Sequence, residues 1–157
     1  LRVSAQEPPA TNAATPDVAD FRVDSMRIRV DGAELAARLY VPSSTGPHPA
    51  AVLIHGARDS RALPGVAEYL AARGVAVLDV EKRGVGGSTG RWDRQSFLGR
   101  AEDIEVALEV LSAHPAVDRQ RIGLIGHSQG GWIAQIVAAN RPQLAFVVLL
   151  AGPAQTV

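Results

Sequence analysis

Residues 122–131 read IGLIGHSQGG, an apolar run followed by a serine with glycines on both sides. The run at 122–125 predicts a buried strand, and the apolar pattern at 131–139 predicts a helix. Between them, residues 126–130 match G-x-S-x-G, the pattern of a sharp strand-to-helix turn that carries a nucleophilic serine. We therefore expect Ser128 at the N-terminus of a helix, where free N–H groups and the helix dipole favour developing negative charge.

Apolar runs and turn signals on both sides of this motif predict an alternation of strands and helices. Strands are expected at 25–30, 34–41, 50–54, 75–80, 122–125 and 146–150, and helices at 66–73, from near 100 to 113, and at 131–139. Asp31-Gly32 is a hairpin turn, and 42–49 is a loop by composition. The order predicts the α/β class, with a mainly parallel, doubly wound sheet and an antiparallel N-terminal hairpin.

The composition excludes several classes of site. Of the 157 residues 46% are hydrophobic, and 16 basic residues balance 16 acidic ones, so nothing favours nucleic acid as a partner. There is no cysteine, and the four histidines do not have the spacing of a zinc site, so we expect neither a metal nor another cofactor. The longest apolar run falls far short of the roughly 20 residues that span a bilayer.

The N-terminal residues 1–20 differ in composition from the rest. They are rich in Pro, Ala and Thr without periodicity, which predicts a mobile leader. Val3-Ser4-Ala5 fits the small-x-small pattern that ends a signal peptide, with cleavage before Gln6. The pattern favours a periplasmic or secreted protein. An Ala-rich tail can match so loose a pattern by chance, and the cytoplasm is the alternative.

His55-Gly56-Ala57 directly follows the expected strand at 50–54. Acyl transfer needs two preorganised N–H donors around the tetrahedral oxygen. One is expected from Gln129, the residue after the nucleophile, and one from this loop. Ala57 is the candidate for the second donor of this oxyanion hole, with Gly56 as the alternate.

The glycine-rich stretch at 83–88 does not match a phosphate-binding loop, because it lacks the Gly-Lys-Ser/Thr ending and no helix pattern starts directly after it. We expect it to shape a loop beside the site, with Arg83 paired to a neighbouring acid. A serine also needs a positioned base. His127 adjoins Ser128 in sequence, which points its side chain away from Oγ, and no other histidine of the chain is suitably placed.

Four segments together resemble the bacterial α/β-hydrolases of the esterase and serine-aminopeptidase-like branch: LIHG (53–56), EKRGVGGSTG (81–90), AVDRQRIGLIGHSQGG (116–131) and FVVLLAGP (146–153). The resemblance covers about residues 22–153. It implies a triad in the order Ser, Asp or Glu, His. Of these only Ser128 is carried over, because the acid, the histidine and a helical cap would follow the last predicted strand. Residues 21–157 are thus predicted to be the N-terminal part of the domain, without cap or last strands.

The leading hypothesis for function is cleavage of a small-molecule carboxylic ester through an acyl-enzyme on Ser128. An amide or peptide hydrolase with the same machinery is the close alternative, and a non-catalytic fragment or binding module is the competing class. A nucleotide-binding domain is least supported, since no G-x-G-x-x-G follows the first parallel strand. The apolar strand at 146–150 would form an open sheet edge, which predicts a complementing C-terminal chain or self-association.

Overall fold

The computed structural model describes residues 20–57 and 63–152. The six strands are β1 (Phe21–Val30), β2 (Ala33–Pro42), β3 (His48–Ile54), β4 (Ala76–Val80), β5 (Val117–His127) and β6 (Phe146–Leu150). The helices are α1 (Val66–Ala71), the short 3₁₀ helix η1 (Trp92–Arg94), α2 (Phe97–Ser112) and α3 (Gln129–Asn140). The predicted leader lies outside the described residues, apart from Asp20.

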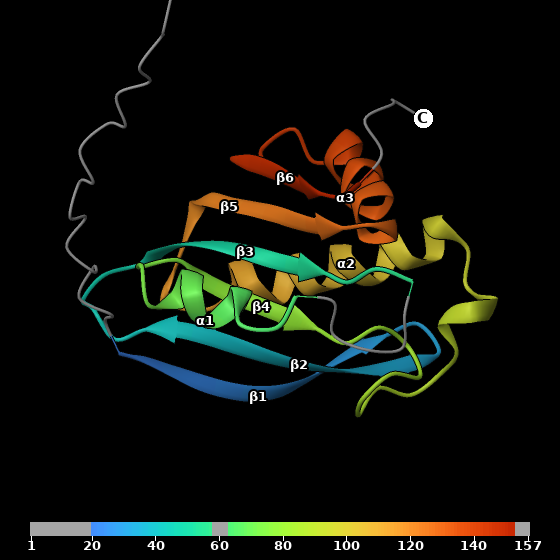
Figure 1. Ribbon diagram of the computed structural model, residues 1–157, viewed down its shortest axis with the longest axis horizontal. Coiled ribbons are helices and arrows are strands. Elements are labelled where there is room, and N and C mark those ends of the chain that lie inside the picture. Colours follow the sequence, from blue (N-terminus) through green and yellow to red (C-terminus); the bar gives the residue numbers. More distant parts are fainter. Residues whose placement is uncertain (1–19, 58–62, 153–157) are drawn as a thin grey trace, which may run out of the picture.

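All six strands form one sheet in the order β1-β2-β4-β3-β5-β6 (Figure 1). β1 and β2 are an antiparallel hairpin, and β2 also runs antiparallel to β4. Each neighbouring pair from β4 through β3 and β5 to β6 is parallel. Gly32 closes the hairpin with a φ of 68°, a conformation that glycine adopts without steric cost. The predicted fold class is confirmed.

Helices cover both faces of the sheet, as a doubly wound arrangement requires. In β3, Ala50, Val52 and Ile54 belong to the core cluster under α2 and α3. The alternating Ala51 and Leu53 belong to a second cluster under α1. Since successive side chains of a strand point to opposite faces, a strand covered on both sides reads as a continuous apolar run.

Several boundaries differ from those that the pattern predicts. α2 begins at Phe97, before Arg100, because Ser96 caps it by accepting a hydrogen bond from the Gly99 N–H at 3.0 Å. α3 begins at Gln129 rather than at 131, and α1 ends at Ala71 rather than at 73. β5 is longer than predicted, because Val117 already pairs with β3 before a shift in register.

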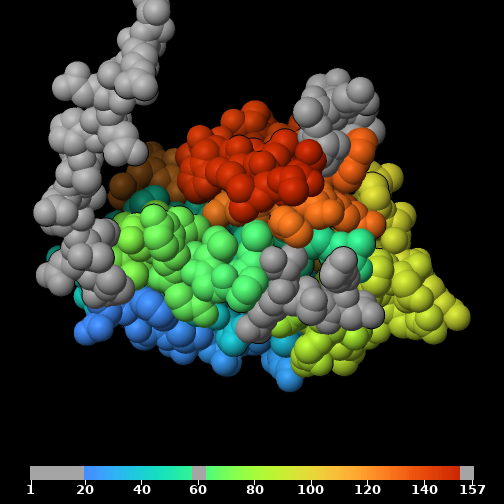
Figure 2. All heavy atoms as spheres, viewed as in Figure 1, coloured from blue at the N-terminus to red at the C-terminus, as the bar shows by residue number. Residues whose placement is uncertain are grey.

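Strand β6 is an edge of the sheet and carries exposed apolar side chains. Within residues 20–57 and 63–152 it pairs only with β5. Val147, Val148 and Leu149 are 37–39% exposed, and the red surface around this strand forms one rim of the molecule in Figure 2. A groove of about 650 Å³ runs between α3 and this strand. The expected apolar edge is therefore present.

Candidate active site

Ser128 lies in the turn between β5 and α3 and has φ 51° and ψ −119°. A residue with a Cβ rarely adopts a positive φ, and such strain costs about 1–3 kcal/mol unless the surroundings hold it. Two backbone hydrogen bonds hold this turn: the Ser128 N–H donates to the Leu150 carbonyl at 2.9 Å, and the Gly131 N–H donates to the Ser128 carbonyl at 2.9 Å. The side chain of Ser128 is left exposed at the carboxyl end of the parallel strands.

The glycines of the motif allow three backbone segments to pack closely. A Cβ on Gly126 would lie 2.5 Å from the Gly130 carbonyl oxygen, and one on Gly130 would overlap the carbonyl oxygen of Ile54. Gly130 thus brings the start of α3 against the end of β3. The glycine-flanked serine predicted from the sequence has the tight turn that the motif requires.

The loop after β3 meets the nucleophile through Gly56. A Cβ on Gly56 would lie 3.2 Å from the Ser128 Cβ, so the Gly56 backbone rests against the serine. His55 and Gly56 are buried, whereas Ala57 is exposed, as Ser128 is. As the first residue of α3, Gln129 has an N–H that the helix does not use. The structure therefore brings the elbow and the predicted oxyanion loop into contact.

Arg100, which the sequence pattern indicates only as part of a helix, links the two halves of this site. Its side chain is 5% exposed, Nη2 donates to the His55 carbonyl at 3.0 Å, and Nη1 donates to Gln129 Oε1. Burial lowers the pKa of Arg100, and the nearby Asp103 carboxylate opposes that shift. The burial of Arg100 can be inferred from its position in the sequence, one turn before Ile104 on the apolar face of α2.

His55 forms a buried pair with Asp79, at the end of β4. His55 Nε2 lies 2.5 Å from Asp79 Oδ1, and both side chains are at most 5% exposed. The pair fixes the ring of His55 beside the oxyanion loop, and the other ring nitrogen, Nδ1, is buried without a hydrogen bond to Ser128. The sequence signal for Asp79 is a carboxylate inside the apolar run at 75–80, since a charged side chain is rarely buried without a partner.

The other histidines do not supply a base to Ser128 within the described residues. His114 Nδ1 accepts a hydrogen bond from the Ala116 N–H at 3.2 Å. His48 is buried at the start of β3. His127 Nδ1 is buried and forms no hydrogen bond there. Ser128 Oγ has no histidine partner in this part of the chain.

The glycine-rich stretch at 83–88 shapes a loop, as expected. Arg83 makes two parallel hydrogen bonds to Asp103, Nε to Oδ2 at 2.9 Å and Nη2 to Oδ1 at 2.7 Å. These hydrogen bonds raise the pKa of Arg83 above its usual value. The Ala36 N–H donates to Ser88 Oγ at 2.8 Å, which ties the loop to β2. The predicted pairing of Arg83 with a neighbouring acid is confirmed.

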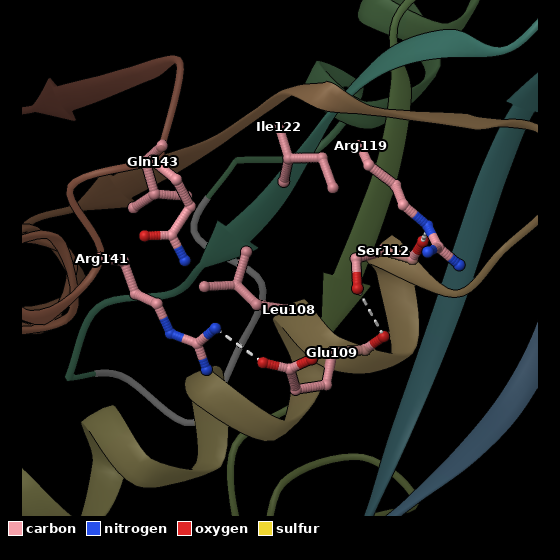
Figure 3. Close-up of a pocket in the computed structure, with 8 residues that line it drawn as sticks. Leu108, Glu109, Ser112, Arg119, Ile122, Arg141 and Gln143 are labelled. Atoms are coloured by element: carbon pink, nitrogen blue, oxygen red, sulfur yellow. Dashed lines mark hydrogen bonds and ion pairs between the residues drawn. The ribbon is translucent and has the colours of Figure 1, made fainter.

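A separate hollow of about 250 Å³ lies between the C-terminal half of α2, the early part of β5 and the turn after α3 (Figure 3). Arg141 Nη1 lies 2.6 Å from Glu109 Oε1 on one wall, and Arg119 Nε donates to the Ser112 carbonyl at 2.7 Å on another. Arg141 is thus paired with a carboxylate and Arg119 is bound to a backbone carbonyl, and Ser128 is not among the residues that line the hollow.

In residues 20–57 and 63–152 no three His, Asp or Glu side chains gather in a group that could hold a metal ion. No helix in these ranges is long and apolar enough to cross a bilayer.

The mixed sheet and the strained serine after β5 define an α/β hydrolase. The family model of the X-Pro dipeptidyl-peptidases (S15 family) matches residues 31–156. The chain belongs to this family.

Named relatives include esterases. An uncharacterized protein of Mycobacterium tuberculosis is 32% identical over 146 residues, which are 92% of this chain and 50% of that protein. Esterase EstD of Thermotoga maritima is 29% identical over 138 residues, 82% of this chain and 32% of the esterase. The structure of Est1E from Butyrivibrio proteoclasticus with bound ferulic acid has a TM-score of 0.68 and 28% identity, over 78% of this chain and 50% of Est1E. The chain spans about half the length of the first relatives it matches.

Proposed function

We propose that this protein cleaves carboxylic esters through an acyl-enzyme on Ser128. The observation that carries the proposal is the backbone of Ser128, with φ 51° and ψ −119° on an exposed turn directly before α3. A strained conformation of this kind persists only where the surroundings impose it, and such positions cluster at active sites. Relatives named as esterases support the choice of an ester substrate.

In the proposed reaction, Ser128 Oγ attacks the ester carbonyl while a base takes its proton. The tetrahedral oxyanion accepts hydrogen bonds from the N–H groups of Ala57 and Gln129. The base then returns the proton to the departing alkoxide as the carbonyl re-forms, leaving the acyl group on Oγ. Water then attacks the acyl-enzyme with the help of the same base, which releases the carboxylic acid and restores the serine.

The base and its orienting acid are proposed to come from residues that follow Val157, in the same polypeptide or in a complementing chain. Two observations support this proposal. Ser128 Oγ has no histidine partner within residues 20–57 and 63–152, and the relatives are about twice as long as the chain. The 157 residues alone are then expected to be inactive, because loss of a triad member costs orders of magnitude in rate.

Hydrolysis of an amide or peptide bond is the second candidate. The family description, X-Pro dipeptidyl-peptidase, favours it. Both reactions use the same nucleophile and oxyanion donors, so substrates must separate them. Matched p-nitrophenyl esters and X-Pro p-nitroanilides, assayed with the full-length protein, give the comparison. A higher kcat/KM on the anilide would replace the ester proposal with a peptidase.

A fluorophosphonate probe tests whether the protein is a serine hydrolase at all. We expect the full-length protein to be labelled at Ser128, and Ser128→Ala to abolish labelling and lower kcat by roughly 10⁶-fold. Intact-protein mass spectrometry locates the adduct. A folded full-length protein that takes no label would support a non-catalytic binding module instead.

A further inference from the structure

Lys82 lies after β4, away from Ser128 in the sequence, yet it contacts the proposed oxyanion loop. Its Nζ donates to the Gly56 carbonyl oxygen at 2.6 Å. The side chain is 8% exposed, and the ammonium also lies 4.1 Å from the ring centroid of Trp92. A charge-assisted hydrogen bond in such a desolvated position is stronger than a neutral one.

The carbonyl that Lys82 holds belongs to the same peptide group as the Ala57 N–H. This peptide bond is trans, so its C=O and N–H point in opposite directions within one plane. When Lys82 fixes the Gly56 oxygen, it therefore also fixes the direction of the Ala57 N–H. The hydrogen bond polarises the peptide group as well, which makes that N–H a better donor to a developing oxyanion.

The residue before Gly56 is also held by neighbouring side chains. Arg100 occupies the preceding carbonyl, that of His55, at 3.0 Å, and the ring of His55 is bound to Asp79 at 2.5 Å. Gly56 has the Ser128 side chain on one side. The cavity that His55, Lys82 and Arg100 line together is small, about 20 Å³.

We propose that Lys82 is a positioning residue that orients and polarises the Gly56–Ala57 peptide group, so that the Ala57 N–H serves the oxyanion hole. This inference rests on the proposed function of Ser128. Lys82 acts on the Ala57 N–H alone, because the Gly56 N–H belongs to the preceding peptide group, whose His55 carbonyl is held by Arg100.

The test compares Lys82→Met, Lys82→Gln and Lys82→Arg in the full-length protein. Met removes the donor, Gln keeps a neutral donor and Arg keeps a cationic one. Removal of a whole oxyanion donor costs about 10²–10³ in kcat, so we expect Lys82→Met to lose roughly 10- to 100-fold in kcat. KM should stay within about threefold, because the ground-state carbonyl uses the donor little. Lys82→Gln should fall between Met and the wild type, and Lys82→Arg should recover most of kcat.

Arg141→Met is the matched control, since it removes a half-buried cation of similar size that pairs with Glu105 and Glu109 away from the site. It should leave kcat and the fluorophosphonate labelling rate unchanged. If Lys82→Met does not fold, Lys82→Gln decides. If folded Lys82→Met or Lys82→Gln has the labelling rate and the kcat of the wild type, the inference about Lys82 is wrong and the proposed function still stands. A wild-type protein that takes no label at Ser128 would overturn the proposed function and the inference together.

Discussion

Backbone strain near the candidate site is concentrated at two residues. Ser128 and Ala151 are the non-glycine residues with positive φ, 51° and 49°, in the described part of the chain. They flank one hydrogen bond, from the Ser128 N–H to the carbonyl of Leu150. Strain of this kind costs about 1–3 kcal/mol per residue. The end of β6 and the nucleophile turn therefore support each other, and a change at either residue is expected to affect both.

Tyr40 gives a prediction for stability against pH. Burial raises its pKa to about 12, with further upward contributions from the carboxylates of Glu68 and Asp79. The unfolded phenol titrates near pH 10. Since the folded state binds the proton more tightly, this contribution is fully present below about pH 10 and is lost as the pH rises from 10 to 12.

We therefore expect the urea midpoint of the wild type to fall above about pH 10, and to fall less in Tyr40→Phe. Tyr69→Phe is the control, because Tyr69 is 57% exposed and should leave the wild-type dependence unchanged. Chemical unfolding at several pH values between 8 and 11 gives the comparison. Parallel curves for the wild type and Tyr40→Phe would contradict the assignment to Tyr40.

At the scale of elements, the contact between α3 and β3 depends on Gly130. A Cβ there would overlap the backbone oxygen of Ile54, which cannot move without distorting the sheet. We expect Gly130→Ala to destabilise the protein by about 1–3 kcal/mol and to slow fluorophosphonate labelling of Ser128. Urea unfolding followed by circular dichroism measures the first effect.

Gly99→Ala in α2 is the matched control. Its Cβ would meet the flexible Gln95 side chain at 3.2 Å and Ser96 Oγ at 3.5 Å, and no backbone atom. Alanine favours a helix over glycine by about 0.5–1 kcal/mol. It should leave the protein as stable as the wild type or more so. A Gly130→Ala protein as stable as Gly99→Ala would show that the elbow tolerates a wider spacing than this packing implies.

At the scale of the whole molecule, the sheet has an apolar edge at β6. We expect the 157-residue chain to self-associate through this edge. Within the described residues β6 pairs on one side only, and its exposed Val148 adds an apolar contact for a second strand. Val148→Lys should weaken association by about tenfold or more, which corresponds to about 1.4 kcal/mol. Sedimentation velocity across a concentration series measures it.

The control for the edge is Leu98→Lys, which adds the same charge at a 64% exposed apolar position on α2 and should not change association. If the wild-type chain stays monomeric, soluble and cooperatively folded at high concentration, the edge is not a pairing site. The proposal that a later segment supplies the base and the acid would remain, because it rests on Ser128 Oγ and on the length of the relatives.

The sequence alone determined the features whose cause is local. Apolar runs predict the parallel strands, Asp31-Gly32 predicts the hairpin turn, and the glycines around Ser128 predict the nucleophile turn. These features follow from backbone sterics and from the alternation of side chains within a few residues. The predicted ends of helices and strands are less accurate, because a cap such as Ser96 extends a helix beyond its apolar pattern.

The tertiary structure alone decided which polar groups surround the site. His55 pairs with Asp79, Arg100 holds the His55 carbonyl and Lys82 holds that of Gly56, across 24, 45 and 26 residues of sequence. A buried charge inside an apolar stretch signals that a partner exists, because an unpaired one is too costly. The identity of the partner depends on the order of the strands in the sheet and on the helix that covers them. Neither can be predicted from the spacing of residues in the sequence.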